Sequence, residues 1–268
     1  MRDQATAPGE PLSTGAPRPS WHHSEAVMGT IVTFDAYGEL AGDARSRARA
    51  LARARAGLQR ADALFSTYKP DSPINQLRRG EIDEAALPEP MGSVLERCRE
   101  LRELSAGWFD PWRVPGGVDP TGYVKGWAAE QALAVLAPIA PCVIVNAAGD
   151  LVVSAALPDG HPVRAGIVDP ANPHQILVIA EVTAALATSG TAERGAHLFD
   201  PFAGRAQVKA ASASVCGADL GTADALATAL AVAGRQGLAI IEQIPGYEAL
   251  VIEEDGHQLV TSGFPRVA

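Results

Sequence analysis

The sequence predicts an α+β fold, and two observations carry this prediction. Segments rich in Val, Ile and Thr, which favour strands, follow one another in runs, while the helical segments are grouped together. The last two strand segments, 249–253 and 258–262, are joined by an Asp255-Gly256 turn that is typical of a hairpin. A parallel α/β fold would instead alternate strands and helices along the chain.

The first half of the chain is predicted to begin with a strand and a long helix. Residues 27–37 are rich in Ile, Val, Thr and Phe, which indicates a strand. Asp43 is placed to cap a helix that continues to Phe65, because apolar residues then recur at three- and four-residue spacing. Beyond Phe65 we expect a loop at 66–72, helices at 91–105 and 126–136, and an irregular Gly- and Pro-rich segment at 107–122.

The second half is predicted to be mainly strands, interrupted by one Ala- and Leu-rich helix. Thr222 is expected to cap this helix and Gly234 to end it, and a further helix is expected at 236–243. The strands expected before it lie at 143–146, 151–154, 163–168, 176–179, 183–187 and 210–215.

Composition describes an ordinary globular protein and excludes some classes of partner. Of the 268 residues, 47% are hydrophobic and 20% charged, enough to bury a substantial core. The net charge of −9 argues against a general nucleic-acid or anionic-membrane surface. Arginines do cluster between Arg45 and Arg60, but they alternate with Ala on the predicted helix, which favours a solvated basic face.

Cysteines and the N-terminal residues indicate a cytoplasmic protein. Three cysteines, Cys98, Cys142 and Cys216, are far apart and form no zinc-binding spacing, so we expect buried, reduced thiols. Residues 1–20 hold four prolines and little apolar sequence, and we expect them to form a disordered tail before one domain at 21–268. We expect no export signal, no lipid anchor and no transmembrane span.

Asp224 and Thr228 form the first candidate site. They lie four residues apart on the predicted helix, so their oxygens share one face and could ligate Mg²⁺. The alternative for each is structural. An Asp in the first turn commonly meets the helix dipole, and a Thr one turn later commonly bonds to a backbone carbonyl. The spacing alone favours the structural alternative.

Several loops carry polar residues that packing does not require. Lys125 follows the loop at 119–124 near a predicted helix start, where a phosphate would be favoured, although it could equally be a surface lysine. Gly149-Asp150 and Ser189-Gly190 are compatible with simple turns. A lone histidine such as His197 more often has a structural role than a catalytic one. Taken together, the order of these residues along the chain favours a functional interpretation over a structural one.

That order resembles the ApbE family of Mg²⁺-dependent FAD:protein FMN transferases. The family implies an ApbE-like fold of largely antiparallel sheets with helices packed on them. The two most specific matches are Thr188-Ser189-Gly190 and the segment at 223–229. The other matching segments, in family order, are Met28-Gly29-Thr30, Ser66-Thr67-Tyr68 with Asp71-Ser72, 107–111, 119–126, 146–150, 168–170 and 197–204.

The resemblance implies a role for each matching residue. Asp224 and Thr228 would ligate Mg²⁺ through their side chains, together with a backbone carbonyl, that of Gly122. His197 would be the general base. The residues implied to line the FAD site are Met28, Tyr68, Trp108, Phe109, Asp110, Asp119, Lys125 and the backbone at Leu198.

The implied reaction transfers FMN from FAD to a Thr or Ser of a target flavoprotein and releases AMP. Two alternatives remain open: an FAD pyrophosphatase that uses water as nucleophile, and a flavin-binding protein without turnover. The chain is also shortened relative to the family, since only seven residues separate Pro111 from Asp119. Ala148, Thr191 and Ala203 depart from the family motifs. Trp112 is the residue of the short connection large enough to cover a flavin by stacking.

Overall fold

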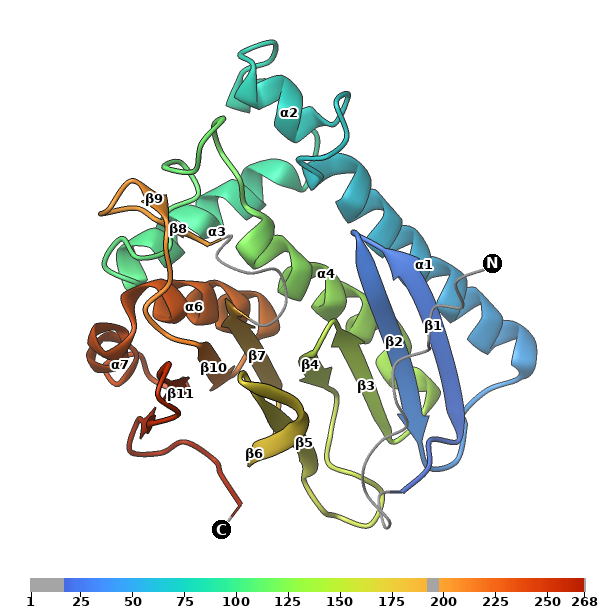
Figure 1. The fold of residues 1–268 in the computed structure, drawn as a ribbon. Helices are drawn as coiled ribbons and strands as arrows, with labels where there is room; N and C mark the ends of the chain where they lie inside the picture. The colour runs from blue at the N-terminus through green and yellow to red at the C-terminus, as the bar shows by residue number, and fades with distance from the viewer. Residues whose placement is uncertain (1–16, 192–197, 268) are drawn as a thin grey trace, which may run out of the picture.

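An eight-stranded sheet with every neighbouring pair antiparallel forms the centre of the molecule, in the order β1-β2-β3-β4-β7-β10-β11-β12 (Figure 1). The computed structural model describes residues 17–191 and 198–267. The strands of this sheet are β1 Trp21–Val27, β2 Thr30–Tyr37, β3 Cys142–Ala147, β4 Asp150–Val153, β7 Ala185–Gly190, β10 Ser212–Gly217, β11 Glu248–Ile252 and β12 Gln258–Val260.

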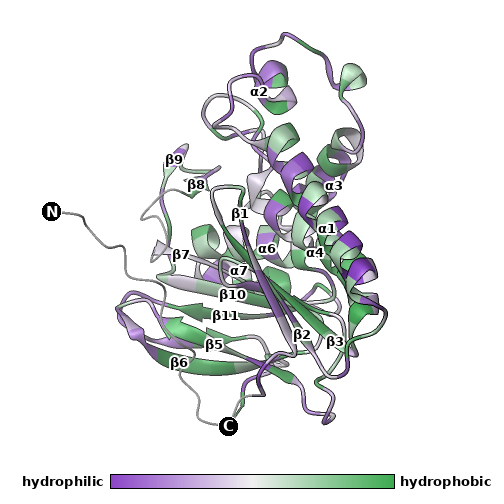
Figure 2. Ribbon diagram, turned by 90° about the vertical axis from the view of Figure 1, so that its right-hand side faces the viewer, coloured by the Kyte–Doolittle hydropathy of each residue, from purple (hydrophilic) through white to green (hydrophobic). Residues whose placement is uncertain are grey.

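Helices cover one face of the sheet, and a hairpin covers part of the other (Figures 1 and 2). The hairpin consists of β5 Val163–Asp169 and β6 Asn172–Val182, and a separate short pair is formed by β8 Phe199–Asp200 and β9 Arg205–Ala206. The α+β prediction is therefore confirmed. The α-helices are α1 Ala44–Phe65, α2 Pro73–Arg78, α3 Met91–Leu104, α4 Thr121–Leu136, α6 Leu220–Ala233 and α7 Arg235–Ile241, with 3₁₀ turns at Glu84–Ala86 and Ala137–Ile139.

Two hydrophobic cores follow from this layering. The larger one lies between the helices and the sheet and includes Phe34, Leu58 and Leu226. The smaller one lies between the sheet and the β5–β6 hairpin and includes Ile144 and Ile252. The three cysteines are buried and unpaired, as predicted, and burial raises the pKa of the Cys98 and Cys216 thiols to about 12. Among the described residues, no helix is both long and apolar enough to span a membrane.

Helix α1 forms where the sequence predicts it. The Asp43 carboxylate accepts the backbone N–H of Ser46, which satisfies one of the free donors of the first turn. The buried side chains of α1 are Ala54, Leu58, Ala61 and Phe65, and they lie on the predicted apolar stripe.

Helices α4 and α6 cross at close range, and Gly126 makes this crossing possible. A Cβ at Gly126 would lie 2.5 Å from the carbonyl oxygen of Leu220 and 2.9 Å from the Cα of Gly221. Both are backbone atoms, which cannot rotate away. The missing side chain thus allows the second turn of α4 to contact the first turn of α6 directly, and these turns form part of the site described below.

Three predicted boundaries are wrong for identifiable reasons. Residues 27–37 form two strands, because Met28 and Gly29 make a turn at positive φ of 54° and 71°. Helix α6 starts at Leu220, since Asp219 caps it by accepting the Thr222 N–H, so Thr222 is not the cap. Helix α4 starts at Thr121, five residues before the predicted start at 126.

Other segments differ in length or were not predicted. Helix α2 at 73–78 was not predicted, although Ser72 caps it and Pro73 occupies its first position. Strand β6 is longer than the predicted 176–179, and β7 is shifted toward Gly190 relative to the predicted 183–187. Of the predicted tail at 1–20, residues 1–16 lie outside the described part of the chain.

Candidate functional site

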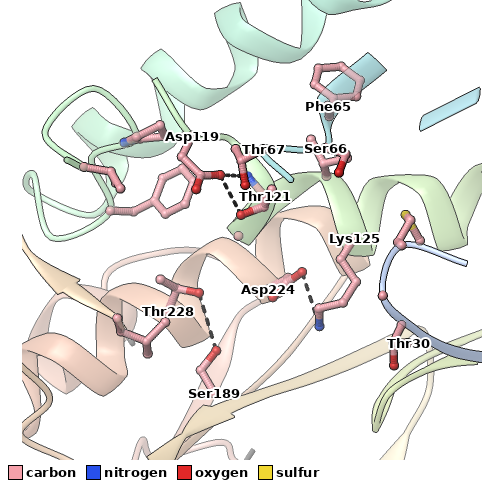
Figure 3. Close-up of a pocket in the computed structure, with 18 of the residues that line it drawn as sticks. Thr30, Phe65, Ser66, Thr67, Asp119, Thr121, Lys125, Ser189, Asp224 and Thr228 are labelled. Carbon is pink, nitrogen blue, oxygen red and sulfur yellow. Dashed lines mark hydrogen bonds and ion pairs between the residues drawn. The ribbon is translucent and has the colours of Figure 1, made fainter. Parts of the chain in front are cut away.

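A cavity of about 580 Å³ opens between the helical layer and one end of the sheet. The C-terminal end of α1, the loop after it and the segment at 108–114 form one wall. The first turns of α4, the end of β7 and helix α6 form the other. Its volume falls in the range of small-molecule and cofactor sites. Figure 3 shows side chains from both walls pointing into it.

The residues that the sequence singled out converge on this cavity from distant parts of the chain. His197 is the exception in that it lies outside the described residues, so its role stays a prediction. The predicted residues that line the cavity are Met28, Tyr68, Trp108, Phe109, Asp110, Asp119, Gly122, Lys125, Leu198, Asp224 and Thr228.

Asp224 and Thr228 of α6 and Gly122 of α4 all line the cavity at the α4–α6 crossing. The Asp224 side chain is buried, and its Oδ2 accepts the N–H of Gly126 at 3.2 Å. The Thr228 hydroxyl lies 3.4 Å from the hydroxyl of Ser189 (Figure 3). A Cβ at Gly122 would lie 3.2 Å from Thr228 Oγ1, so glycine is what lets this backbone approach the hydroxyl.

Lys125 lies between two buried carboxylates from different elements. Its Nζ is 3.5 Å from Asp224 Oδ2 on α6 (Figure 3), and it forms a second ion pair with Asp150 Oδ2 at the start of β4. Asp150 is 1% exposed, and its other oxygen accepts the N–H of Thr188 at 2.9 Å. The lysine therefore adds a positive charge to the cavity while balancing carboxylates that line it or lie behind it.

Aromatic side chains form the wall that faces these charges. Trp108 packs against Phe202 with ring centroids 4.5 Å apart, and the Lys209 ammonium lies 4.3 Å from the Trp108 ring centroid. Phe109 is buried beneath them, whereas Tyr68 is 85% exposed at the cavity rim. The wall thus offers flat apolar surface for a ring system, and part of it is open to solvent.

The short connection between Pro111 and Asp119 is held by hydrogen bonds from helix α2. Arg78 donates from Nε to the carbonyl of Gly116 at 2.9 Å and from a terminal nitrogen to that of Pro115 at 3.0 Å. Trp112, predicted to cover a flavin, instead packs beneath arginines of α3, 5.1 Å from the Arg99 guanidinium, and does not line the cavity. The interpretation of Trp112 as a flavin cover is wrong.

Sequence reasoning did not identify two of the polar residues in this region. Asp150 belonged to the matching segment at 146–150 but was given no role in the site, and its contact with Lys125 joins residues on different elements that no spacing rule connects. Ser189 belonged to a matching motif, but its position beside Thr228 requires the β7–α6 packing. Across the described residues, no group of three or more His, Cys, Asp or Glu side chains could hold a metal. Any metal here would depend on the mixed oxygen set of Asp224, Thr228 and Gly122.

The fold and cavity define an α+β protein with a cavity of ligand size between a helix pair and the end of an antiparallel sheet. A model of the ApbE family matches residues 28–116 and 115–251. The chain belongs to the ApbE family. No curated protein matches it.

Solved structures support the fold assignment. The flavin transferase ApbE from Vibrio cholerae is 21% identical with a TM-score of 0.77, covering 91% of this chain and 97% of that one. The ApbE protein from Thermotoga maritima is 21% identical with a TM-score of 0.75, over 90% and 97% of the two chains. The flavinyl transferase ApbE from Pseudomonas stutzeri, in its apo form, is 20% identical with a TM-score of 0.72, over 90% and 94%. The three agree with an ApbE-like fold.

Proposed function

We propose that the protein is an Mg²⁺-dependent FAD:protein FMN transferase, which attaches FMN to a Thr or Ser hydroxyl of a target flavoprotein and releases AMP. The observation that carries this proposal is the meeting, in one cavity, of the oxygen donors on α6 with Lys125 and with the Trp108 wall. A dinucleotide such as FAD has both a doubly charged pyrophosphate and a flat ring system, so it uses both halves of the cavity.

The donor set fits Mg²⁺. Asp224 would supply a carboxylate, Thr228 a hydroxyl and Gly122 a backbone carbonyl, all hard oxygens, and Mg²⁺ takes few protein ligands when it also holds phosphate. The close approach of Gly122 to Thr228 Oγ1 is the structural feature that supports this assignment. When bound, the ion would neutralise charge on the pyrophosphate.

The chain's own residues then hold and orient the substrate. Lys125 would pair with a pyrophosphate oxygen, and Trp108 with Met28 would contact the flavin ring. The acceptor hydroxyl oxygen forms a bond to the FMN-side phosphorus as the P–O bond to AMP breaks, and AMP leaves with the bridging oxygen. His197 is our candidate to take the hydroxyl proton, because a histidine near its ordinary pKa can accept it. Three buried, unpaired cysteines favour a reducing compartment, and on that ground we place this reaction in the cytoplasm.

Mass spectrometry of a mixture of protein, FAD, Mg²⁺ and a peptide with an acceptor Thr tests the proposal. The expected result is a peptide heavier by one FMN unit, with an equal amount of AMP and no labelling when Asp224→Asn replaces the wild type. Free FMN and AMP without labelled peptide would instead indicate a pyrophosphatase. Unchanged FAD that stays bound would indicate a binding protein.

A further inference from the structure

Asp150 is a buried carboxylate whose partners lie on two other elements. Its side chain does not line the cavity, but it meets Lys125, which does. Its second oxygen accepts the backbone N–H of Thr188 at 2.9 Å, so the carboxylate is held on the end of β7. A fixed buried charge of this kind restricts where the ammonium of a flexible lysine side chain can lie.

The position of the Lys125 ammonium determines which negatively charged group it can pair with. It is 3.5 Å from Asp224 Oδ2, so it is close to this carboxylate without a tight hydrogen bond. Without the charge of Asp150, Coulomb attraction would draw the lysine onto Asp224, since the two groups are already near and Asp224 is buried. Asp224 lines the cavity, so a lysine paired tightly with it would use there the N–H donors that a phosphate in the cavity could otherwise accept from.

We propose that Asp150 is a positioning residue that holds the Lys125 ammonium from outside the cavity lining, which keeps it off Asp224 and leaves its other N–H donors to the phosphate of a bound nucleotide. The inference rests on the proposed function in taking a phosphate-bearing flavin as the ligand. Asp150 acts only through Lys125 and does not touch the ligand. It therefore affects ligands with phosphate and not those that carry only the ring.

The substitution Asp150→Asn tests this, because the amide oxygen can still accept the Thr188 N–H while the charge is lost. We expect FAD to bind about ten-fold more weakly, the loss of roughly one charge-assisted contact, and riboflavin to bind as in the wild type. Fluorescence titration with both flavins at one fixed Mg²⁺ concentration measures this. In a Lys125→Met background the substitution should have no further effect on FAD.

Asp200→Asn is the matched control. Asp200 is likewise buried, accepts backbone N–H groups at 2.8 and 2.9 Å, and has a lysine, Lys209, 4.0 Å away. It does not line the cavity. The same change there should leave the ratio of FAD to riboflavin affinity unaltered. An equal shift of this ratio in both variants would overturn the proposal, and so would an unchanged ratio in Asp150→Asn.

Thermal unfolding gives a second readout that needs no ligand. Lys125→Met should lower the midpoint because it leaves Asp150 buried without its cation, and Asp150→Asn in the same chain should restore it. If the losses in unfolding midpoint of the two single variants simply add in the double variant, the proposed link between Asp150 and Lys125 is refuted. If neither flavin binds any variant or the wild type, the proposed function fails, while this unfolding cycle still decides whether Asp150 holds Lys125.

Discussion

Replacing Gly126 with alanine tests whether the α4–α6 crossing determines the geometry of the site. Alanine favours a helix over glycine by about 1 kcal/mol, so propensity alone predicts a more stable protein. The new Cβ would, however, lie 2.5 Å from the Leu220 carbonyl oxygen, where ordinary contacts begin at 3.4 Å. Separating the helices by about 1 Å to relieve this contact has a typical overpacking cost of about 1–3 kcal/mol.

Subtracting the propensity gain, we expect Gly126→Ala to destabilise the protein by up to about 2 kcal/mol, which lowers the unfolding midpoint by up to about 8 °C. Gly57→Ala is the matched control. Gly57 lies in the middle of α1, is exposed, and has nothing within 4 Å of its hypothetical Cβ. This substitution should stabilise the protein by about 0.5–1 kcal/mol, because only the propensity gain remains.

Chemical and thermal denaturation of the three proteins measure the two free energies of unfolding. The Gly126 variant should also lose FAD affinity, since Gly122 and Lys125 on α4 would move away from Asp224 and Thr228 on α6. The decisive quantity is the sign of the difference between the two variants. Should Gly126→Ala stabilise the protein as much as Gly57→Ala, the close crossing of α4 and α6 is not a constraint and the reasoning is refuted.

Three further predictions concern the site and its surroundings. Asp224→Asn should abolish Mg²⁺-dependent AMP release, although the amide oxygen can still accept the Gly126 N–H. AMP release that persists in this variant would refute the metal assignment. Trp108→Ala should increase iodide quenching of bound FAD and Trp112→Ala should not, because only Trp108 lines the cavity; equal quenching contradicts this. Burial raises the pKa of Glu130 from 4.5 to about 7, so the folded state binds the extra proton and stability falls as pH rises from about 4.5 to about 7. Glu130→Gln should remove this loss of stability, which is on the order of 1–2 kcal/mol for a partly exposed group. Denaturation near pH 5 and near pH 8 measures it, and an unchanged dependence of the unfolding free energy on pH in the variant would contradict the prediction.

The long, periodic elements were predictable from sequence because local physics determines them. Helix α1 is an example, since the Asp43 cap and the stripe that ends at Phe65 are both visible in the sequence. The C-terminal hairpin was predicted for the same reason, as its turn contains Gly256 at a positive φ of 84°.

Elements whose signals depend on tertiary contacts were not predictable. The turn between β1 and β2 places Met28 at positive φ, which the residue type does not suggest and which the pairing of the two strands imposes. The start of α6 was predicted at a Thr222 cap, whereas Asp219 caps the helix, and the hydrogen bond from the Tyr247 hydroxyl joins Asp219 to a residue distant in the sequence.

For the candidate site, the sequence identified residues better than it identified their environments. Asp224 has the sequence position of a first-turn charge, and replacing such a charge at an exposed site commonly costs only about 0.3–1 kcal/mol of stability. It is 3% exposed and accepts a buried N–H, so Asp224→Ala should cost about 1–3 kcal/mol. Trp112 had the right size to cover a ring, but the path of the short connection directs it to the arginines of α3. Burial and chain path are properties of the whole fold.

Helix α6 has an unusual burial pattern that bears on how the protein responds to its ligands. Every residue from Leu220 to Ala233 is buried except Thr228, which faces the cavity. Amide protons in such a helix exchange with solvent chiefly through global unfolding, whereas loops exchange through local opening. Deuterium uptake should therefore respond to FAD mainly in the opposite wall, at 66–69 and 108–111. The wall formed by α6, which we propose to hold the metal, would be rigid before the ligand arrives, and the wall that we propose to contact the flavin would be the part that becomes ordered.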